Sequence, residues 1–160
     1  MSATEPPISV SLEQESDFAF RITFDHETHA PLLTDEPSPL GHDRGPNPSR
    51  LLLASVVNCL TASLLFALRK FGNDPGRMET NCTLEPERNA QGRWRIPRID
   101  VQIQLGVPWA SLKHAQRALA QFEDFCVVTQ SVRGGIDVSV RVVDSSGAAP
   151  PVQAGAAPGA

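Results

Sequence analysis

The sequence predicts an α+β fold with antiparallel sheets and two main helices. Short segments that alternate apolar and polar residues, the pattern of half-buried strands, surround two longer segments whose apolar residues have helical spacing. Their order along the chain is β-β-(β)-α-β-β-α-β, which favours an α+β domain with mostly antiparallel pairing. The 160 residues, 41% hydrophobic and 20% charged, suffice for one domain with a buried core.

We assign residues 8–144 to this domain. Residues 1–7 are expected to form a flexible N-terminus. The last segment, 145–160, reads SSGAAPPVQAGAAPGA. Because it is rich in Ala, Gly and Pro and contains almost no large apolar residue, it is expected to be a disordered tail.

Three strands are expected ahead of the first helix. Residues 8–12 and 18–24 alternate with period two and are separated by a polar turn, EQESD, at 13–17. Residues 31–34 add a short strand. The loop at 35–48 contains four prolines and two glycines, so we expect it to be irregular but conformationally restricted.

The first helix is predicted over residues 48–71. Asn47 suits the N-cap position, and Pro48 suits the first helical position because its missing N–H costs nothing there. Arg69 and Lys70 lie in the last turn, where they interact favourably with the helix dipole. Gly72 can then end the helix in a left-handed conformation.

The second half of the domain is expected to contain a hairpin, a helix and a strand. Segments 77–88 and 94–105 alternate and flank a turn at 89–92, as the strands of a hairpin do. A single apolar stripe predicts a second helix over residues 108–126. The final alternating segment, 136–142, predicts one more strand.

The apolar run Leu51–Leu68 within the first helix supports three interpretations. As a membrane span its 18 residues are somewhat fewer than the ~20 normally needed, and polar residues such as Asn58 interrupt it. As a core helix it would bury Cys59 as a small hydrophobic residue. As a reactive site, Cys59 would use the space beside small residues one turn away, although the same space would also admit a second helix.

Charge and composition restrict the expected partners. The net charge of −4, without a long basic cluster, argues against a nucleic acid or an anionic membrane as partner. The N-terminal stretch MSATEPPISVSLEQESD lacks the features of a secretory signal, which predicts a cytoplasmic protein. The cysteines Cys59, Cys82 and Cys126 form no CxxC pair and lie far from the histidines in sequence, so no disulfide framework, metal or cofactor is expected.

Two segments around the cysteines resemble a known family. The helix NPSRLLLASVVNCL contains Cys59, the segment FEDFCVVTQSVRGGIDVSVRV contains Cys126, and the loop DEPSPLGHDRGPNP precedes the first of them. Over residues 18–143 this pattern resembles the OsmC/Ohr family (osmotically induced protein C and organic hydroperoxide resistance proteins), and it is closer to the OsmC-like branch. Cys59 corresponds to the first cysteine of the family and Cys126 to the second.

The resemblance implies a fold, an assembly and an activity. It implies an intertwined homodimer with active sites at the subunit interface, in which Cys59 and Cys126 lie close together. It also implies a cytoplasmic thiol peroxidase of the oxidative stress response that reduces small organic hydroperoxides. Cys59 would become a sulfenic acid and then form a disulfide with Cys126. A thiol or a lipoyl-type dithiol would reduce that disulfide again.

The sequence departs from the family where the reactive thiol needs a cation. Cys59 lies beyond the reach of the helix dipole, and in the family an arginine held by a glutamate of the first helical turn activates the thiol. Here Ser49 or Arg50 replaces the glutamate. Arg44, Arg21 and Arg50 are the candidates for the cation, and Arg44, in the loop before the helix, is the first choice. The missing glutamate favours the alternative hypothesis, an OsmC-fold protein that binds a small apolar ligand or is structural, without efficient peroxidase turnover.

The remaining cysteine contexts suggest different roles. Glu123 and Asp124 directly precede Cys126, and their negative charge is expected to disfavour a thiolate there, which suits a resolving cysteine better than a nucleophile. Cys82 alternates inward with Met78 and Leu84, so it is expected to be a packing residue.

Overall fold

The structure, a computed structural model, describes residues 6–151. They belong to two compact units, Met1–Leu52 and Leu53–Ala160, which are described one at a time. The helix α1, Pro48–Lys70, begins in the first unit and lies mostly in the second. Its bounds confirm the predicted helix, and Asn47 accepts a hydrogen bond from the backbone N–H of Arg50 at 3.1 Å, as an N-cap does.

The first unit contains a three-stranded antiparallel sheet in the order β1-β2-β3. Its strands are β1 (Val10–Ser16), β2 (Ala19–Phe24) and β3 (Leu32–Thr34). The expected turn at 13–17 is wrong, because β1 continues through Glu13 and pairs with β2 as far as Ser16. Asp17, with φ of 46°, allows a turn tight enough for that pairing.

The loop between β3 and α1 is organised by the buried carboxylate of Asp35, which is 2% exposed. It accepts hydrogen bonds from three backbone N–H groups, those of Glu36 (2.9 Å), His42 (3.1 Å) and Arg44 (3.3 Å). A Cβ at Gly41 would lie 2.2 Å from Asp35 Oδ1, so only glycine fits there. Burial acts to raise the pKa of Asp35, but these N–H groups and the Arg44 guanidinium hold it below its ordinary value.

We therefore expect the first unit to lose stability in acid through Asp35. Because its pKa is lower in the folded than in the unfolded chain, its contribution is present above the ordinary Asp pKa of about 3.9 and is lost as the pH falls below it. Asp35→Asn should lower the melting temperature at pH 7, and the difference from wild type should shrink toward pH 3. Circular dichroism melts at several pH values measure this. Glu27→Gln, at an exposed site, is the control, and a pH-independent difference would contradict the prediction.

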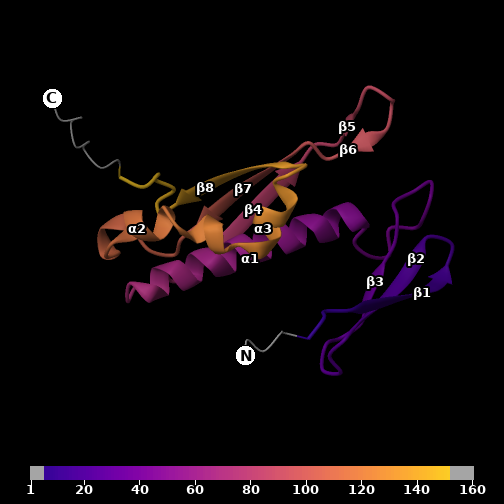
Figure 1. The fold of residues 1–160 in the computed structure, drawn as a ribbon, viewed down its shortest axis with the longest axis horizontal. Coiled ribbons are helices and arrows are strands. Elements are labelled where there is room, and N and C mark those ends of the chain that lie inside the picture. Colours follow the sequence, from indigo (N-terminus) through magenta and orange to yellow (C-terminus); the bar gives the residue numbers. More distant parts are fainter. Residues whose placement is uncertain (1–5, 152–160) are drawn as a thin grey trace. The chain divides into compact units, whose positions relative to one another are not determined.

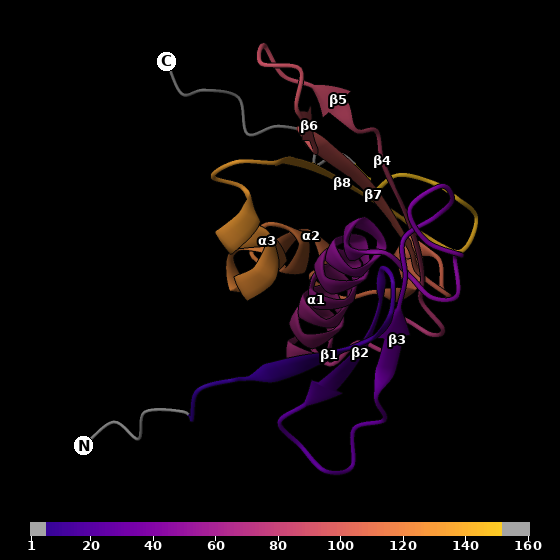
Figure 2. The ribbon, with the colours of Figure 1, turned by 90° about the vertical axis from the view of Figure 1, so that its right-hand side faces the viewer.

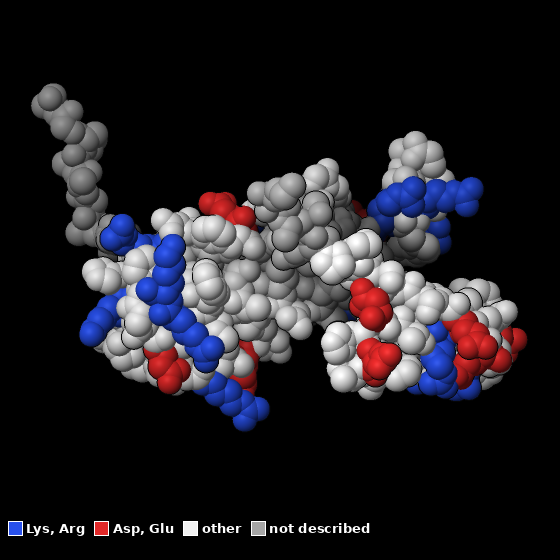
Figure 3. Space-filling view, turned by 60° about the horizontal axis from the view of Figure 1, so that its bottom comes forward, with Lys and Arg blue, Asp and Glu red and all other residues white. Residues whose placement is uncertain are grey.

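The second unit contains a mixed sheet in the order β4-β7-β8. The strands are β4 (Glu79–Leu84), β7 (Arg98–Gln104) and β8 (Asp137–Val143). β4 and β7 form the predicted antiparallel hairpin, whereas β8 pairs with β7 in parallel. The hairpin ends in a separate two-stranded piece, β5 (Glu87–Arg88) with β6 (Trp94–Arg95). The blue side chains that lie on this piece in Figure 3 are arginines.

The segment between β7 and β8 is broken into four short helical pieces on the same face of the sheet as α1 (Figures 1 and 2). They are η1 (Trp109–Ser111), α2 (Ala115–Leu119), η2 (Phe122–Phe125) and α3 (Val127–Val132). The prediction of one helix over 108–126 is therefore wrong. His114 has a left-handed conformation, with φ of 53°, and the backbone at Cys126 is extended, so a continuous helix cannot form. The piece α3 was not predicted.

The core of the second unit lies between α1 and the sheet. Val56, Leu60, Leu64 and Leu68 repeat every four residues along α1 and are all fully buried. They belong to one cluster with the inward residues of β7, which include Ile99 and Ile103. The opposite side of α1, with Ala54, Ser55, Asn58, Ala62 and Phe66, is exposed.

By length and composition alone α1 is apolar enough to cross a membrane, although only 28% of its most apolar 18-residue window is buried within the chain. The core helix of a soluble protein passes the same test. The buried stripe of Leu60 and its neighbours shows that one side of α1 belongs to a protein core.

The start of the segment assigned to the tail makes defined contacts. Asp144 accepts hydrogen bonds from the backbone N–H groups of Trp109 (3.2 Å) and Ala148 (3.0 Å), and the Trp109 indole donates to the Ala148 carbonyl at 2.9 Å. Residues 152–160, the rest of the expected tail, lie outside the described residues, as do residues 1–5. The assignment of 8–144 to one domain stays a prediction.

Truncation of the α1 stripe should destabilise the second unit strongly. Leu64→Ala removes a fully buried side chain and is expected to lower the free energy of unfolding by about 2–5 kcal/mol. Urea denaturation followed by fluorescence of Trp109 and Trp94 measures the loss. Leu40→Ala, at a site that is 57% exposed, should change it by less than about 0.5 kcal/mol. Equal effects of the two changes would contradict this account of the core.

Candidate functional site

Cys59 lies on α1 at the edge of the buried stripe. It directly precedes the buried Leu60, and it is half-buried itself and packs against the core cluster. Its predecessor Asn58 is exposed. The α1 packing therefore presents the Cys59 sulfur at the boundary between the core and the surface, where a small molecule can reach it.

Cys126 lies in the break between η2 and α3 and is completely buried. Its backbone N–H donates to the Glu123 carbonyl at 3.1 Å, and its carbonyl accepts from the backbone N–H of Gln130 at 2.9 Å. Its Sγ lies 3.0 Å from the Thr129 hydroxyl, to which the thiol donates. Thr129 is also fully buried.

The two cysteines meet although 126 − 59 = 67 positions separate them. Their side chains are close enough for Cys59 to raise the pKa of Cys126, and both thiols are free. Burial raises the pKa of Cys126, and the contact with Cys59 raises it further, while the hydroxyl and backbone N–H of Thr129 act in the opposite direction. Cys126 is therefore a neutral thiol at neutral pH, within reach of Cys59.

An ion pair fixes the segment that holds Cys126. Arg133 pairs with Glu123 across the break, and its guanidinium also reaches the Val138 carbonyl at 3.5 Å. The expectation that Glu123 and Asp124 disfavour a Cys126 thiolate needs correction. The pKa of Cys126 is raised, but its causes are burial and Cys59, and the Glu123 charge is balanced by Arg133.

The candidate arginines Arg44 and Arg21 both belong to the first unit. Arg44 lies 3.5 Å from Asp35 through Nε and donates to the Ser16 hydroxyl at 3.0 Å through Nη2. Arg21 pairs with Glu15. Cys59 and Cys126 belong to the second unit, so the role of Arg44 or Arg21 as the cation beside Cys59 stays a prediction.

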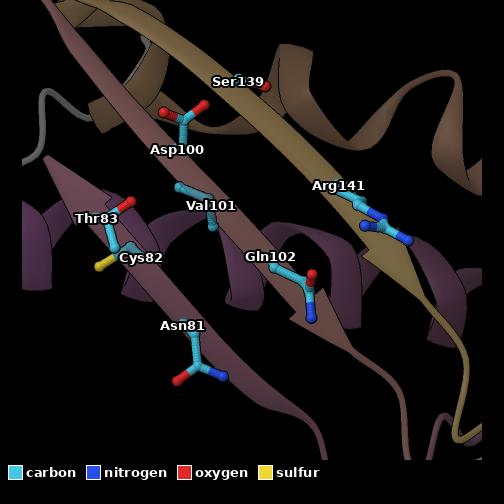
Figure 4. A pocket seen from close by; sticks show the side chains of 8 residues that line it. All are labelled: Asn81, Cys82, Thr83, Asp100, Val101, Gln102, Ser139 and Arg141. Atoms are coloured by element: carbon cyan, nitrogen blue, oxygen red, sulfur yellow. The ribbon is translucent and has the colours of Figure 1, made fainter. Parts of the chain in front are cut away.

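Cys82 lies on β4, half-buried, and packs against the core as its alternation predicts. Burial raises its pKa. A hollow of about 370 Å³ opens on the sheet beside it, and neither Cys59 nor Cys126 lines that hollow. Figure 4 shows its polar side chains, among them Asp100, Gln102 and Arg141, on the face turned away from α1.

A second depression, of about 360 Å³, follows α1 and is lined by Asn58, Thr61, Ala62 and Thr80, among others, but not by Cys59. The hydroxyls of Thr61 and Thr80 lie 2.7 Å apart and join α1 to β4. Within residues 6–151, no three His, Cys, Asp or Glu side chains are grouped as metal ligands.

Sequence reasoning found the two cysteines but missed Thr129 and Asp35. The only signal for Thr129 was its position three residues after Cys126, where a turn of helix brings a hydroxyl back to the sulfur. Asp35 is one of several acidic residues in a loop, and no sequence pattern distinguishes it from the others. Its role is visible only in the structure, where the backbone N–H groups of His42 and Arg44 donate to it.

Comparisons with known proteins agree with this architecture. The family model described as OsmC-like protein matches residues 41–141. A search of curated proteins finds no match. Solved structures are similar in fold at low sequence identity. A putative osmotic stress induced and detoxification response protein from Psychrobacter arcticus is 16% identical, with a TM-score of 0.71 over 88% of this chain and 98% of that one.

Two further structures extend the comparison. An OsmC-like protein of unknown function from Vibrio cholerae is 13% identical, with a TM-score of 0.71 over 86% of this chain and 99% of that one. The organic hydroperoxide resistance protein OhrB of Bacillus subtilis is 19% identical, with a TM-score of 0.62 over 87% and 99%. The α+β fold and the cysteine pair thus define an OsmC-type protein. The chain belongs to the OsmC-like family.

Proposed function

We propose that this protein is a thiol peroxidase that reduces small organic hydroperoxides, with Cys59 as nucleophile and Cys126 as resolving cysteine. The observation that supports this proposal most is the proximity of the half-buried Cys59 to the buried Cys126, which is close enough for Cys59 to raise the pKa of Cys126. Two free thiols near one another are what a reversible disulfide requires.

The reaction has three steps. The Cys59 thiolate attacks one peroxide oxygen, the O–O bond breaks, and the alcohol leaves after taking up a proton, so that Cys59 becomes a sulfenic acid. The Cys126 sulfur then attacks the Cys59 sulfur, and hydroxide leaves as water with the proton of the Cys126 thiol. An external thiol or lipoyl-type dithiol reduces the disulfide by exchange and is itself oxidised.

The difference in burial between the two cysteines supports Cys59 as the nucleophile and Cys126 as the resolving cysteine. Cys59 is accessible in part, whereas Cys126 is 0% exposed, so a peroxide reaches Cys59 first. The raised pKa of Cys126 keeps it protonated and protects it from direct oxidation. Apolar neighbours of Cys59, such as Val56 and Leu60, favour an organic over an inorganic peroxide.

Cys59 also needs a cation, since it lies about three turns into α1, beyond the region where the helix dipole acts. Arg44 is our first candidate and Arg21 the second. The first turn of α1 contains no acidic residue, and Ser49 or Arg50 replaces the glutamate of the family. Asp35, which binds Arg44, supplies a carboxylate from a different position.

The assembly that we propose is a homodimer. In the described chain two apolar residues of β1 are exposed, Val10 at 56% and Leu12 at 59%. Phe66 on α1 is 63% exposed. Apolar areas of this size are normally covered by a partner, and a second copy would cover both. The cytoplasm, where thiols are kept reduced, is the compartment that suits two free cysteines.

The alternative function is a ligand-binding or structural OsmC-fold protein without efficient turnover. The absence of an acidic residue in the first turn of α1 favours it, because the glutamate that holds the arginine in the family is missing there. The two proposals share the fold and differ in whether Cys59 reacts with peroxide.

The decisive test is a single-turnover oxidation. One equivalent of cumene hydroperoxide added to the reduced protein should consume two thiols, and tryptic mapping should join peptide 51–69 to peptide 118–133. Cys59→Ser should lower peroxide turnover by more than about a thousandfold, whereas Cys82→Ser should leave it unchanged. Three unreacted thiols in the wild type would rule out the peroxidase and leave the alternative.

The dimer has a separate test. Light scattering at micromolar concentration should give twice the chain mass of 17.3 kDa. Ala62→Arg places a charge in the middle of the exposed side of α1 and should yield a monomer, because a buried unpaired charge opposes association. Thr83→Arg, on the exposed outer side of β4, is the matched control. A monomeric wild type would contradict the proposal.

A further inference from the structure

We propose that Thr129 is a positioning residue that makes Cys126 the leaving sulfur when the disulfide is reduced, so that the reductant attacks the sulfur of Cys59. This inference rests on the proposed Cys59–Cys126 disulfide and adds the direction in which that disulfide is opened.

The geometry around the Cys126 sulfur supports this role. Thr129 Oγ1 lies 3.0 Å from Cys126 Sγ, and both residues are 0% exposed. A hydroxyl both donates and accepts hydrogen bonds. It accepts from the neutral thiol, and after rotation about its C–O bond it donates to the thiolate. The Thr129 hydroxyl can thus hydrogen-bond to the sulfur in both its neutral and its ionised form, without any change in the backbone.

Thr129 opposes the effect that the other surroundings of Cys126 have on its ionisation. Burial and the contact with Cys59 disfavour the ionised sulfur, whereas the Thr129 hydroxyl and its backbone N–H favour it. A hydrogen bond to a charged group in a buried site is stronger than one between neutral groups. Thr129 therefore stabilises the thiolate at the moment when the S–S bond breaks.

The exposure of the two cysteines also indicates that the reductant attacks Cys59. A reductant thiolate must approach one of the two sulfurs, and that of Cys59 is accessible in part while that of Cys126 is fully buried. Attack on Cys59 forms a mixed disulfide there and releases Cys126 as the thiolate. A second reductant thiolate then attacks the reductant sulfur of the mixed disulfide and releases Cys59. The reductant gains one disulfide, and the two protons of its thiols pass to the released thiolates.

The first experiment measures the ionisation of Cys126 alone. In the double variant Cys59→Ser, Cys82→Ser the only thiol is Cys126, and its titration is followed by the thiolate absorbance near 240 nm. Adding Thr129→Val should raise the pKa, and adding Thr129→Ser in its place should restore it. Ser131→Ala is the control, because that hydroxyl donates instead to the Val127 carbonyl at 2.7 Å. An unchanged pKa in Thr129→Val would overturn the role of the hydroxyl.

The second experiment finds the attacked sulfur in the wild-type chain. The disulfide is formed with diamide, so that no peroxidase activity is needed, and is treated briefly with the monothiol 2-mercaptoethanol before quenching with acid. The adduct is expected on peptide 51–69, which contains Cys59. An adduct mainly on peptide 118–133, which contains Cys126, would overturn the proposal even if Thr129→Val failed to fold.

The two experiments also separate this inference from the proposed function. Thr129→Val should slow reduction of the diamide-formed disulfide by about tenfold, the effect expected of one hydrogen bond to a charged group, and Thr129→Ser should restore the rate. If cumene hydroperoxide leaves the wild-type thiols intact while these results hold, the peroxidase fails and the role of Thr129 stands. If the wild type turns over peroxide normally but Thr129→Val does not slow reduction of the disulfide, the peroxidase stands and the role of Thr129 fails.

Discussion

The packing of α1 on the sheet of the second unit is the constraint on which the cysteine site depends. Leu60 and Leu64 are fully buried, which fixes the rotation of the helix about its axis. Since successive residues are about 100° apart around a helix of 3.6 residues per turn, Cys59 must lie at the edge of the buried stripe. A rotation by one residue would either bury Cys59 completely or turn it to the solvent. The half-buried state that reactivity needs is thus a consequence of where the leucines are.

The broken segment after β7 provides the other half of the site. Cys126 lies where η2 ends and α3 begins. Its backbone there is extended, and its sulfur donates to the Thr129 hydroxyl and is close enough to Cys59 for that thiol to raise its pKa. The ion pair between Arg133 and Glu123 spans the break. Asn73, just after α1, accepts from the Lys113 N–H at 2.7 Å, so the end of the long helix and the start of the broken segment are also joined.

The sequence predicted the elements that local residue patterns determine. It missed the features that depend on contacts between residues far apart in the chain. Asn47 and Pro48 mark the start of α1 because caps are local, and the alternation of Cys82 with Met78 and Leu84 identified inward residues because burial follows spacing. The breaks at His114 and Cys126 leave no such pattern. The extent of β1 was missed because its polar end is stabilised by pairing with β2, where Glu13 lies opposite Arg21. Both cysteines of the site came from resemblance to a family, since no spacing rule relates residues 67 positions apart.

The groups that the proposal assigns to the two cysteines differ in their partners. The candidate cations already have carboxylate partners, Arg44 with Asp35 and Arg21 with Glu15, and a paired arginine stabilises a third group less than a free one does. Cys126 has local donors in Thr129, so the return to the dithiol is favoured by groups within the second unit alone.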